Sequence, residues 1–172
     1  MNITDYDKDY NEDLFKTYTD NIFVQIYTSI MTKEIEKIKH FVSEDIFKNL
    51  EEKITSLGSN IQMYDELNVK STNILNKKIE NNKIVIEVEL ISRYMDYIIN
   101  EDGNKVSGDN ERRIEKRNLL TFEKNINSLD NMNAAKCPGC GSNIDVNANG
   151  KCFYCGATYD LEKRNYILTK LN

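Results

Sequence analysis

The stretch Ile84-Val85-Ile86-Glu87-Val88-Glu89-Leu90 has the clearest strand-like hydrophobic pattern in this chain. Apolar residues occupy every second position, and two glutamates stand between them. This alternation is typical of a β-strand with one buried side and one solvent-facing side. We expect the strand to continue through Tyr94 to Ile99.

Upstream of this strand, apolar residues recur every three or four positions, as they do in helices that bury one face. The pattern predicts a long helix over residues 11–31 and a short helix over residues 33–41. It predicts a third helix over residues 43–57, which Ser43 caps and Gly58 ends. Three helices therefore precede the first strand.

The segment between the third helix and strand 84–99 predicts a connector followed by another strand. Residues 60–65 lack a regular apolar period, so we expect them to form the connector. Residues 66–79 then form a strand. The polar run 80–83 has the composition of a hairpin turn, which would make the two strands antiparallel neighbours.

Downstream of Ile99 the sequence predicts a loop, a third long strand and a short closing segment. Residues 100–110 contain two Gly-Asp combinations, typical of a loop between strands. Residues 112–125 form the third strand, with Leu120 and Phe122 facing inward. The apolar end of residues 159–171 is expected to be a final strand or turn that packs on the rest of the protein.

This order of elements predicts an α+β fold, in which helices cover one face of a twisted antiparallel sheet. A strongly twisted sheet wrapped around one long helix forms a cone with a hollow interior. Hollows of this kind often bind apolar groups at their mouth. The sequence therefore indicates a binding site inside the cone.

The second part of the chain contains a cysteine cluster. Two Cys-x-x-Cys pairs, separated by eleven residues, hold every cysteine in the protein: Cys137, Cys140, Cys152 and Cys155. This is the ligand spacing of a zinc ribbon. A glycine follows each pair, at Gly141 and Gly156, where the backbone of such a turn commonly needs a positive φ.

Four thiolates would close a tetrahedron around one ion, with metal–sulfur bonds of about 2.3 Å. Such a closed zinc site is structural, because it lacks the open position that a catalytic zinc keeps for water. Iron fits the same four-thiolate set, and two disulfides or a redox-active pair are further interpretations of the spacing. The structural zinc site is the interpretation that the sequence favours.

Size and charge limit the domain organisation and the partners of the 172-residue chain. The sequence predicts an α+β domain over residues 1–130 and a zinc ribbon with its closing segment over residues 131–172. The net charge of −5 disfavours nonspecific binding to nucleic acid. Residues 1–13 are acidic and unlike a signal peptide, and paired thiols suit a reducing compartment, so we expect a cytoplasmic protein.

The run RYMDYIINEDGNKVSGD at residues 93–109, placed ahead of a ribbon, resembles the Tim44-like domain. The resemblance covers about residues 10–172 and extends to a bacterial branch that carries a C-terminal zinc ribbon. It implies a cone similar to the nuclear transport factor two-like fold. Relatives tend to have Trp in the third strand and in the closing segment, where this chain has residues 119–122 and Tyr166.

The resemblance implies a non-enzymatic adaptor or a transport-related binding module that engages a protein partner, a hydrophobic ligand or the inner face of a membrane. A local basic stretch could contact an anionic membrane or an acidic partner; it comprises Arg112, Arg113, Lys116 and Arg117. A solvated strand with alternating charges is the simpler interpretation of the same residues.

Two other classes of function compete with this interpretation. An enzyme of the cone-shaped fold would need a tuned acid or base in its pocket, and the candidates are Asp96, Tyr94 and Tyr97. The only histidine, His40, lies between two predicted helices and is expected to be a surface or packing residue. A nucleic-acid-binding ribbon would need basic strands, whereas residues 136–159 are close to neutral.

The cysteine spacing predicts one metal ion per chain. Inductively coupled plasma mass spectrometry of the purified protein should find about one equivalent of zinc or iron, because four thiolates saturate one tetrahedral ion. Cys140→Ser should lower that stoichiometry, whereas Ser142→Ala should leave it unchanged. Protein without stoichiometric metal, or with Cys137 in a disulfide, would contradict the prediction.

Overall fold

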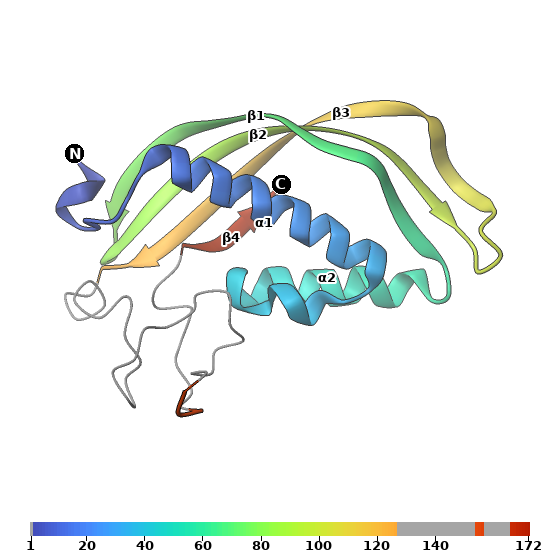
Figure 1. Cartoon of the computed structure of the whole chain (residues 1–172), viewed down its shortest axis with the longest axis horizontal. Coiled ribbons are helices and arrows are strands. Elements are labelled where there is room, and N and C mark those ends of the chain that lie inside the picture. Colours follow the sequence, from blue (N-terminus) through green and yellow to red (C-terminus); the bar gives the residue numbers. More distant parts are fainter. Residues whose placement is uncertain (1, 127–153, 157–165) are drawn as a thin grey trace.

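The computed structural model of the chain describes residues 2–126, 154–156 and 166–172. Two α-helices and two short 3-10 helices precede a four-stranded sheet in these ranges (Figure 1). In chain order the elements are η1 (Ile3–Asp5), α1 (Glu12–Thr32), η2 (Ile35–Phe41), α2 (Glu44–Leu57), β1 (Ile61–Glu80), β2 (Lys83–Ile99), β3 (Lys105–Asn125) and β4 (Ile167–Leu171).

The two long helices confirm the sequence prediction. Asn11 caps the start of α1 by accepting a hydrogen bond from the backbone N–H of Leu14 at 2.9 Å. Lys33, in the left-handed region with φ 60°, ends α1. Ser43 caps α2 and Gly58 follows its last residue, as expected from the sequence.

The second predicted helix, over residues 33–41, is instead the 3-10 helix η2 and begins only at Ile35. Lys33 has left the helical region, so the helix cannot start there. The buried residues of η2, Ile35 and Ile38, are three positions apart. Side chains with this spacing lie above one another in a 3-10 helix, which explains the tighter turn.

The strands form one antiparallel sheet in the order β1-β2-β3-β4, as the predicted meander requires. Two connections between elements are shorter in the structure than the sequence predicts. Residues 60–65 were expected to be a connector, yet β1 begins at Ile61 and pairs with the end of β2. The predicted loop 100–110 is a short turn, closed by a hydrogen bond from Asn100 N to Asn104 O at 2.9 Å, and β3 begins at Lys105.

The closing segment completes the sheet. β4 pairs with β3 from Leu120↔Leu171 to Glu123↔Ile167. The backbone N–H of Ser43 also donates to Leu168 O at 2.8 Å, which ties β4 to the start of α2. These contacts join residues 167–171 to the α+β unit, although the predicted division groups them with the ribbon. The predicted boundary near residue 130 lies outside the described residues.

The core lies between α1 and the concave face of the sheet, which arches over both α-helices (Figure 1). The alternating strand supplies Ile86, Val88 and Leu90, and α1 supplies Phe23 and Ile26, all at most 1% exposed. Burying an apolar side chain of this size contributes about 1.5–3 kcal/mol. The predicted inward orientation of Leu120 and Phe122 is confirmed, because both are buried in the same core.

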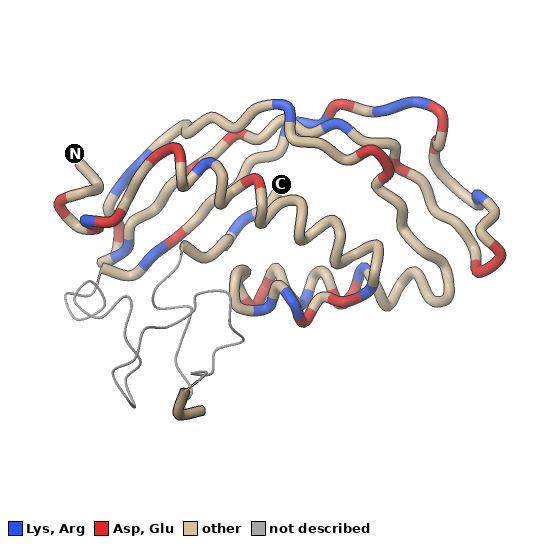
Figure 2. Tube along the Cα trace, viewed as in Figure 1, with Lys and Arg blue, Asp and Glu red and all other residues tan. Residues whose placement is uncertain are grey.

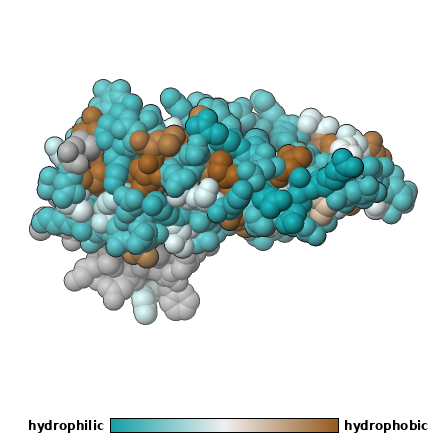
Figure 3. Space-filling model, turned by 90° about the horizontal axis from the view of Figure 1, so that it is seen from above, coloured by the Kyte–Doolittle hydropathy of each residue, from teal (hydrophilic) through white to brown (hydrophobic). Residues whose placement is uncertain are grey.

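The outer face of the arch is largely hydrophilic, with hydrophobic residues in separate spots (Figure 3). This distribution follows from the alternation in β2, which sends Glu87 and Glu89 to the side opposite the core. Both glutamates are partly exposed. The sheet therefore has one buried face and one solvated face, as the sequence predicts.

Aromatic side chains hold the N-terminal segment and β4 at one end of the sheet. The ring centroid of Phe15 lies 5.4 Å from that of Phe122 and 5.1 Å from that of Tyr166. The buried carboxylate of Asp7 accepts a hydrogen bond from Tyr166 Oη at 2.8 Å and pairs with Lys124 Nζ at 2.9 Å. The two places where relatives tend to have Trp thus belong to one cluster.

A bulge in β3 shapes the other end of the sheet. Tyr94 pairs with Ile114, but Asp96 pairs with Asp109, so four residues of β3 stand opposite one residue of β2. Just beyond the bulge, Gly108 has φ +85°, and a Cβ built there would lie 2.3 Å from Asp96 O. The backbones of β2 and β3 lie so close together here that only glycine, which has no Cβ, can occupy this position.

Gly108→Ala should therefore destabilise the protein by at least about 2 kcal/mol, since both the positive φ and the contact with Asp96 O resist a Cβ. Gly103 is a matched control, because it has φ +83° with open space around it. Gly103→Ala should cost only about 1–2 kcal/mol. Urea unfolding of the two variants measures the difference, and equal losses would contradict the close approach.

Candidate functional site

A cavity of about 250 Å³ lies between the two α-helices and the concave face of the sheet. Side chains from α1, α2 and all four strands line it, together with the last residue of the chain. They are Ile26, Tyr27, Ile30, Leu50, Lys53, Tyr64, Tyr94, Asp96, Lys116, Asn118, Leu171 and Asn172. The cavity occupies the position where the sequence predicts a hollow inside the cone.

Three tyrosines from three elements form its aromatic wall. Tyr27 comes from α1, Tyr64 from β1 and Tyr94 from β2. Their ring centroids are 4.5 Å apart for the pair 27–64, 5.5 Å for 27–94 and 5.3 Å for 64–94. Tilted and edge-on rings at these separations attract one another, so the wall is preorganised.

Burial raises the pKa of all three tyrosine hydroxyls above their usual value, because a charged phenolate loses its hydration there. The negative charge of Asp96 adds to the increase for each of them. A hydrogen bond between Tyr27 and Tyr94 raises the pKa of Tyr27 and opposes the increase for Tyr94. The tyrosines are therefore neutral at physiological pH.

Asp96, predicted to point into the cone if no bulge intervened, does line the cavity. The extra residues of the bulge belong to β3, so the alternation of β2 continues undisturbed through Tyr94 and Asp96. Its Oδ1 accepts a hydrogen bond from Gln62 Nε2 at 2.7 Å, and the Gln62 side chain is buried beside it. The amide of Gln62 thus fixes the carboxylate.

Of the two other candidates from the sequence, only Tyr94 lines the cavity together with Asp96. The Tyr97 hydroxyl donates to Asp65 Oδ2 at 3.2 Å, away from the cavity. Tyr94 does line the cavity, as predicted. His40 lies in η2 and is partly exposed, outside the cavity, as expected for a surface or packing residue.

Asn118 is the site residue that the sequence prediction missed. It is completely buried, and its Nδ2 donates to Leu90 O at 3.0 Å and to Ser92 Oγ at 2.9 Å. Its Oδ1 has no hydrogen-bond partner. The sequence could have indicated it, because Asn118 lies two positions before the inward-facing Leu120 in β3 and therefore faces the same side of the sheet.

Two lysines lie at the rim of the cavity. Lys53, on α2, places its Nζ 5.9 Å from the centre of the Tyr64 ring. Lys116, on β3, belongs to the predicted basic stretch. Both side chains are exposed at the mouth, whereas the interior is neutral apart from Asp96. The rim of the cavity is therefore positively charged, whereas the one charged side chain in its interior is the carboxylate of Asp96.

The arginines of the predicted basic stretch lie on a surface where positive and negative side chains are mixed (Figure 2). Arg113 pairs with Glu66 at 3.4 Å, and Arg117 pairs with Glu89. Between them, Glu115 pairs with Lys70 at 3.0 Å. These cross-strand pairs favour the simpler interpretation of the sequence, a solvated strand with alternating charges.

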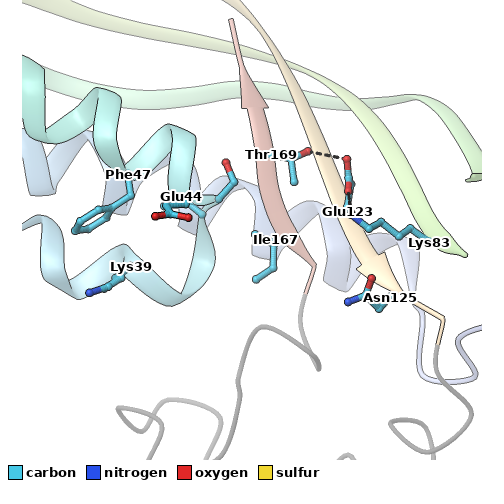
Figure 4. Close-up of a pocket in the computed structure, with 10 residues that line it drawn as sticks. Lys39, Glu44, Phe47, Lys83, Glu123, Asn125, Ile167 and Thr169 are labelled. Carbon is cyan, nitrogen blue, oxygen red and sulfur yellow. Dashed lines mark hydrogen bonds and ion pairs between the residues drawn. The ribbon is translucent and has the colours of Figure 1, made fainter. Parts of the chain in front are cut away.

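A larger hollow, of about 460 Å³, lies beside the start of α2 and the adjacent ends of β3 and β4 (Figure 4). Three of its polar lining groups already have partners, since Glu123 contacts Lys83 at 2.8 Å and Thr169 at 3.3 Å. It lacks the wall of three tyrosine rings that the smaller cavity has. We therefore place the candidate site inside the cone.

The predicted metal ligands Cys137, Cys140 and Cys152 lie outside the described residues. Cys155 is described as an exposed residue of the short segment 154–156. Gly156, which follows it, has φ +72°, as the predicted turn requires. The zinc site itself stays a prediction.

The fold and its cavity define a class: an α+β domain whose curved antiparallel sheet encloses a small binding site against one long helix. The family model of the Tim44-like domain matches residues 1–133, and the chain belongs to that family. No curated protein matches the chain. Of the helices in the described ranges, none has the length and apolar character needed to cross a membrane.

The tyrosine wall predicts a loss of stability in alkali. The folded pKa of each tyrosine lies above its unfolded value near 10, so the unfolded state releases protons first as the pH rises. The free energy of unfolding should be constant below about pH 9 and decrease above pH 10. Urea unfolding between pH 8 and pH 11, with tyrosinate absorbance at 295 nm, measures this.

Tyr64→Phe should reduce the alkaline loss, because it removes one of the ionisable hydroxyls and keeps the ring. A single pKa difference of one unit corresponds to about 1.4 kcal/mol. An unchanged alkaline slope in this variant would contradict the raised pKa of Tyr64.

Proposed function

We propose that the chain is a non-enzymatic binding module whose cone cavity receives a small, partly apolar group. The observation that carries this proposal is the cavity of about 250 Å³ with its wall of three tyrosine rings. Membership of the Tim44-like family supports a transport-related or adaptor role for such a module.

The chemistry of the cavity favours binding over catalysis. Its tyrosines have raised pKa values and cannot act as bases near neutral pH. Asp96 has the one side-chain carboxylate among the described lining residues, and it accepts a hydrogen bond from the amide of Gln62. Tyr97, the third candidate, donates to Asp65 and is not among the residues that line the cavity.

The predicted zinc ribbon adds a second surface to the proposal. Cys137, Cys140, Cys152 and Cys155 would hold one structural ion, whose binding energy folds the small module that carries it. A protein partner could then contact the ribbon while an apolar group occupies the cone. The net charge of −5 argues against a nucleic acid as that partner.

Filling the cavity should weaken the binding of an apolar probe. The neutral fluorophore N-phenyl-1-naphthylamine should bind the full chain with increased emission, because the aromatic wall shields it from water. Leu50, buried in α2, lines the cavity. Leu50→Trp should weaken probe binding at least about tenfold, a loss of about 1.4 kcal/mol, in a fluorescence titration.

The control is Leu75→Trp, because Leu75 lies on β1, is 53% exposed and is not among the cavity residues. This variant should bind the probe as the unmodified chain does. Thermal unfolding must show that Leu50→Trp is folded at the titration temperature, since overpacking costs about 1–3 kcal/mol. Equal affinities in the two variants would place the binding site outside the cone.

A further inference from the structure

The carboxylate of Asp96 lies beside the tyrosine rings of the cavity wall. Asp96 stands directly opposite Tyr64 in the register of β1 and β2, and Tyr94 lies two positions before it on the same face of β2. Side chains at directly opposite positions have Cβ atoms about 4.5–5.5 Å apart. In addition to burial, which is the largest cause, the negative charge of Asp96 raises the pKa of Tyr27, Tyr64 and Tyr94. One carboxylate is therefore close to all three tyrosines.

Asp96 has no positively charged partner in the described part of the chain. Its Oδ1 accepts a hydrogen bond from Gln62 Nε2 at 2.7 Å, but this donor is neutral and leaves the charge uncompensated. No lysine or arginine of the described residues forms an ion pair with it. Asp96 is partly exposed and lines the cavity. A cation in the cavity would supply the missing charge, and the attraction is stronger there than in bulk water.

The chain itself places a cation against this wall. The Nζ atom of Lys53, on α2, lies 5.9 Å from the centre of the Tyr64 ring. An ammonium group at this distance over an aromatic face is attracted by the negative face of the ring. Lys53 forms no ion pair among the described residues, whereas Lys48, on the same helix, pairs with Glu44 at 3.4 Å. The face of the Tyr64 ring is therefore open to a positive group that comes from the mouth of the cavity.

The aliphatic residues of the cavity restrict the kind of cation. Ile26, Ile30 and Leu50 line the same space, and their side chains offer no hydrogen bonds. A primary ammonium group is compact and strongly hydrated, so it loses much hydration in such surroundings. An alkylated ammonium group has apolar methyl groups on its outside and suits both aliphatic and aromatic contacts. Lys53 and Lys116 are exposed at the rim, where water and salt screen their charges.

We propose that the cavity binds an alkylated ammonium group, with Asp96 as its counter-ion and the ring of Tyr64 as its cation–π partner. The bound group takes the place of the ammonium group of Lys53. It belongs either to a free quaternary ammonium compound or to a methylated lysine side chain of a partner protein. This inference rests on the proposed function, because it specifies what occupies the same cavity.

The test compares two ligands of the same shape that differ in charge. Choline has a charged nitrogen where 3,3-dimethyl-1-butanol has a neutral carbon. Titrations of the full chain, followed by NMR chemical shifts, should give a dissociation constant about tenfold lower for choline, since only choline pairs with Asp96 and the ring. Equal affinities, or no binding of choline, would overturn the inference. The proposed function then stands if the naphthylamine probe binds the cavity and falls if it does not.

Two carboxylate variants identify the counter-ion. Asp96→Asn should remove the preference for choline, because it keeps the size of the side chain and an acceptor for Gln62 but removes the charge. Asp65→Asn is the matched control, because Asp65 is exposed on β1 and accepts its hydrogen bond from Tyr97, outside the cavity. This control should keep the preference. A preference retained in Asp96→Asn would overturn the inference. If Asp96→Asn is unfolded by circular dichroism, the two ligands on the unmodified chain decide.

Two lysine variants test the competition with the chain's own cation. Lys53→Gln should bind choline about threefold more tightly, because the ammonium group over the Tyr64 ring is gone. Lys48→Gln removes the same charge from the same helix, but Lys48 does not line the cavity. Its affinity for choline should equal that of the unmodified chain. Equal effects in the two variants, or weaker binding in Lys53→Gln, would contradict the proposed position of the ligand.

A second arm separates the two sources of the ammonium group. A short peptide with one trimethyllysine is compared with choline and with the same peptide that carries an unmodified lysine. Tighter binding of the methylated peptide than of choline, with a loss for the unmodified peptide, supports a partner side chain as the source. Binding of choline that is at least as tight as that of the methylated peptide supports a small-molecule ligand. Both outcomes retain the contact with Asp96.

Discussion

The burial of one face of β2 against α1 is the constraint on which the rest of the structure depends. Ile86, Val88 and Leu90 are buried against Phe23 and Ile26, and all five are at most 1% exposed. Since side chains alternate along a strand, a shift of one residue would bury the glutamates of β2 instead. The register of the central strand therefore determines which residues of β1 and β3 can face the helix.

Curvature of the sheet then creates the cavity. β1 has three irregularities in its pairing with β2, and β3 has the bulge opposite Met95. Bulges bend strands and increase their twist. The sheet arches over α1 instead of lying flat on it (Figure 1). Space remains where the arch leaves the helix, and the aromatic wall and Asp96 lie around it.

The elements that the sequence predicts correctly are those in which apolar residues recur with a regular period. The long helices, β2 and the inward faces of Leu120 and Phe122 follow from apolar spacing, which the core enforces. The start of β1 was missed, because residues 60–65 lack that spacing. The start of β3 was missed because Gly108 was interpreted as a loop residue. Gly108 instead has its positive φ beside a bulge, where two backbones lie close together. The sequence has no pattern that distinguishes a glycine at such a position from a glycine in a loop.

The site was only partly predictable, because it combines elements distant in the chain. Tyr94 and Asp96 could be identified, since they share the parity of the central strand. Their partners Tyr27 and Gln62 depend on how α1 and β1 are placed, which local sequence does not specify. Cys137, Cys140 and Cys152 were identified by spacing alone, and they lie outside the described residues.

Asn118 connects the stability of the fold to the chemistry of the site. Its Nδ2 bonds to β2 are made opposite Leu90, so they favour the register that the core requires. A leucine at this position would pack against the same core without leaving an acceptor unpaired, a penalty of about 1–3 kcal/mol. The hydrogen bonds that its amide nitrogen donates to Leu90 O and Ser92 Oγ offset part of that penalty, because they tie β3 to β2 beside the cavity.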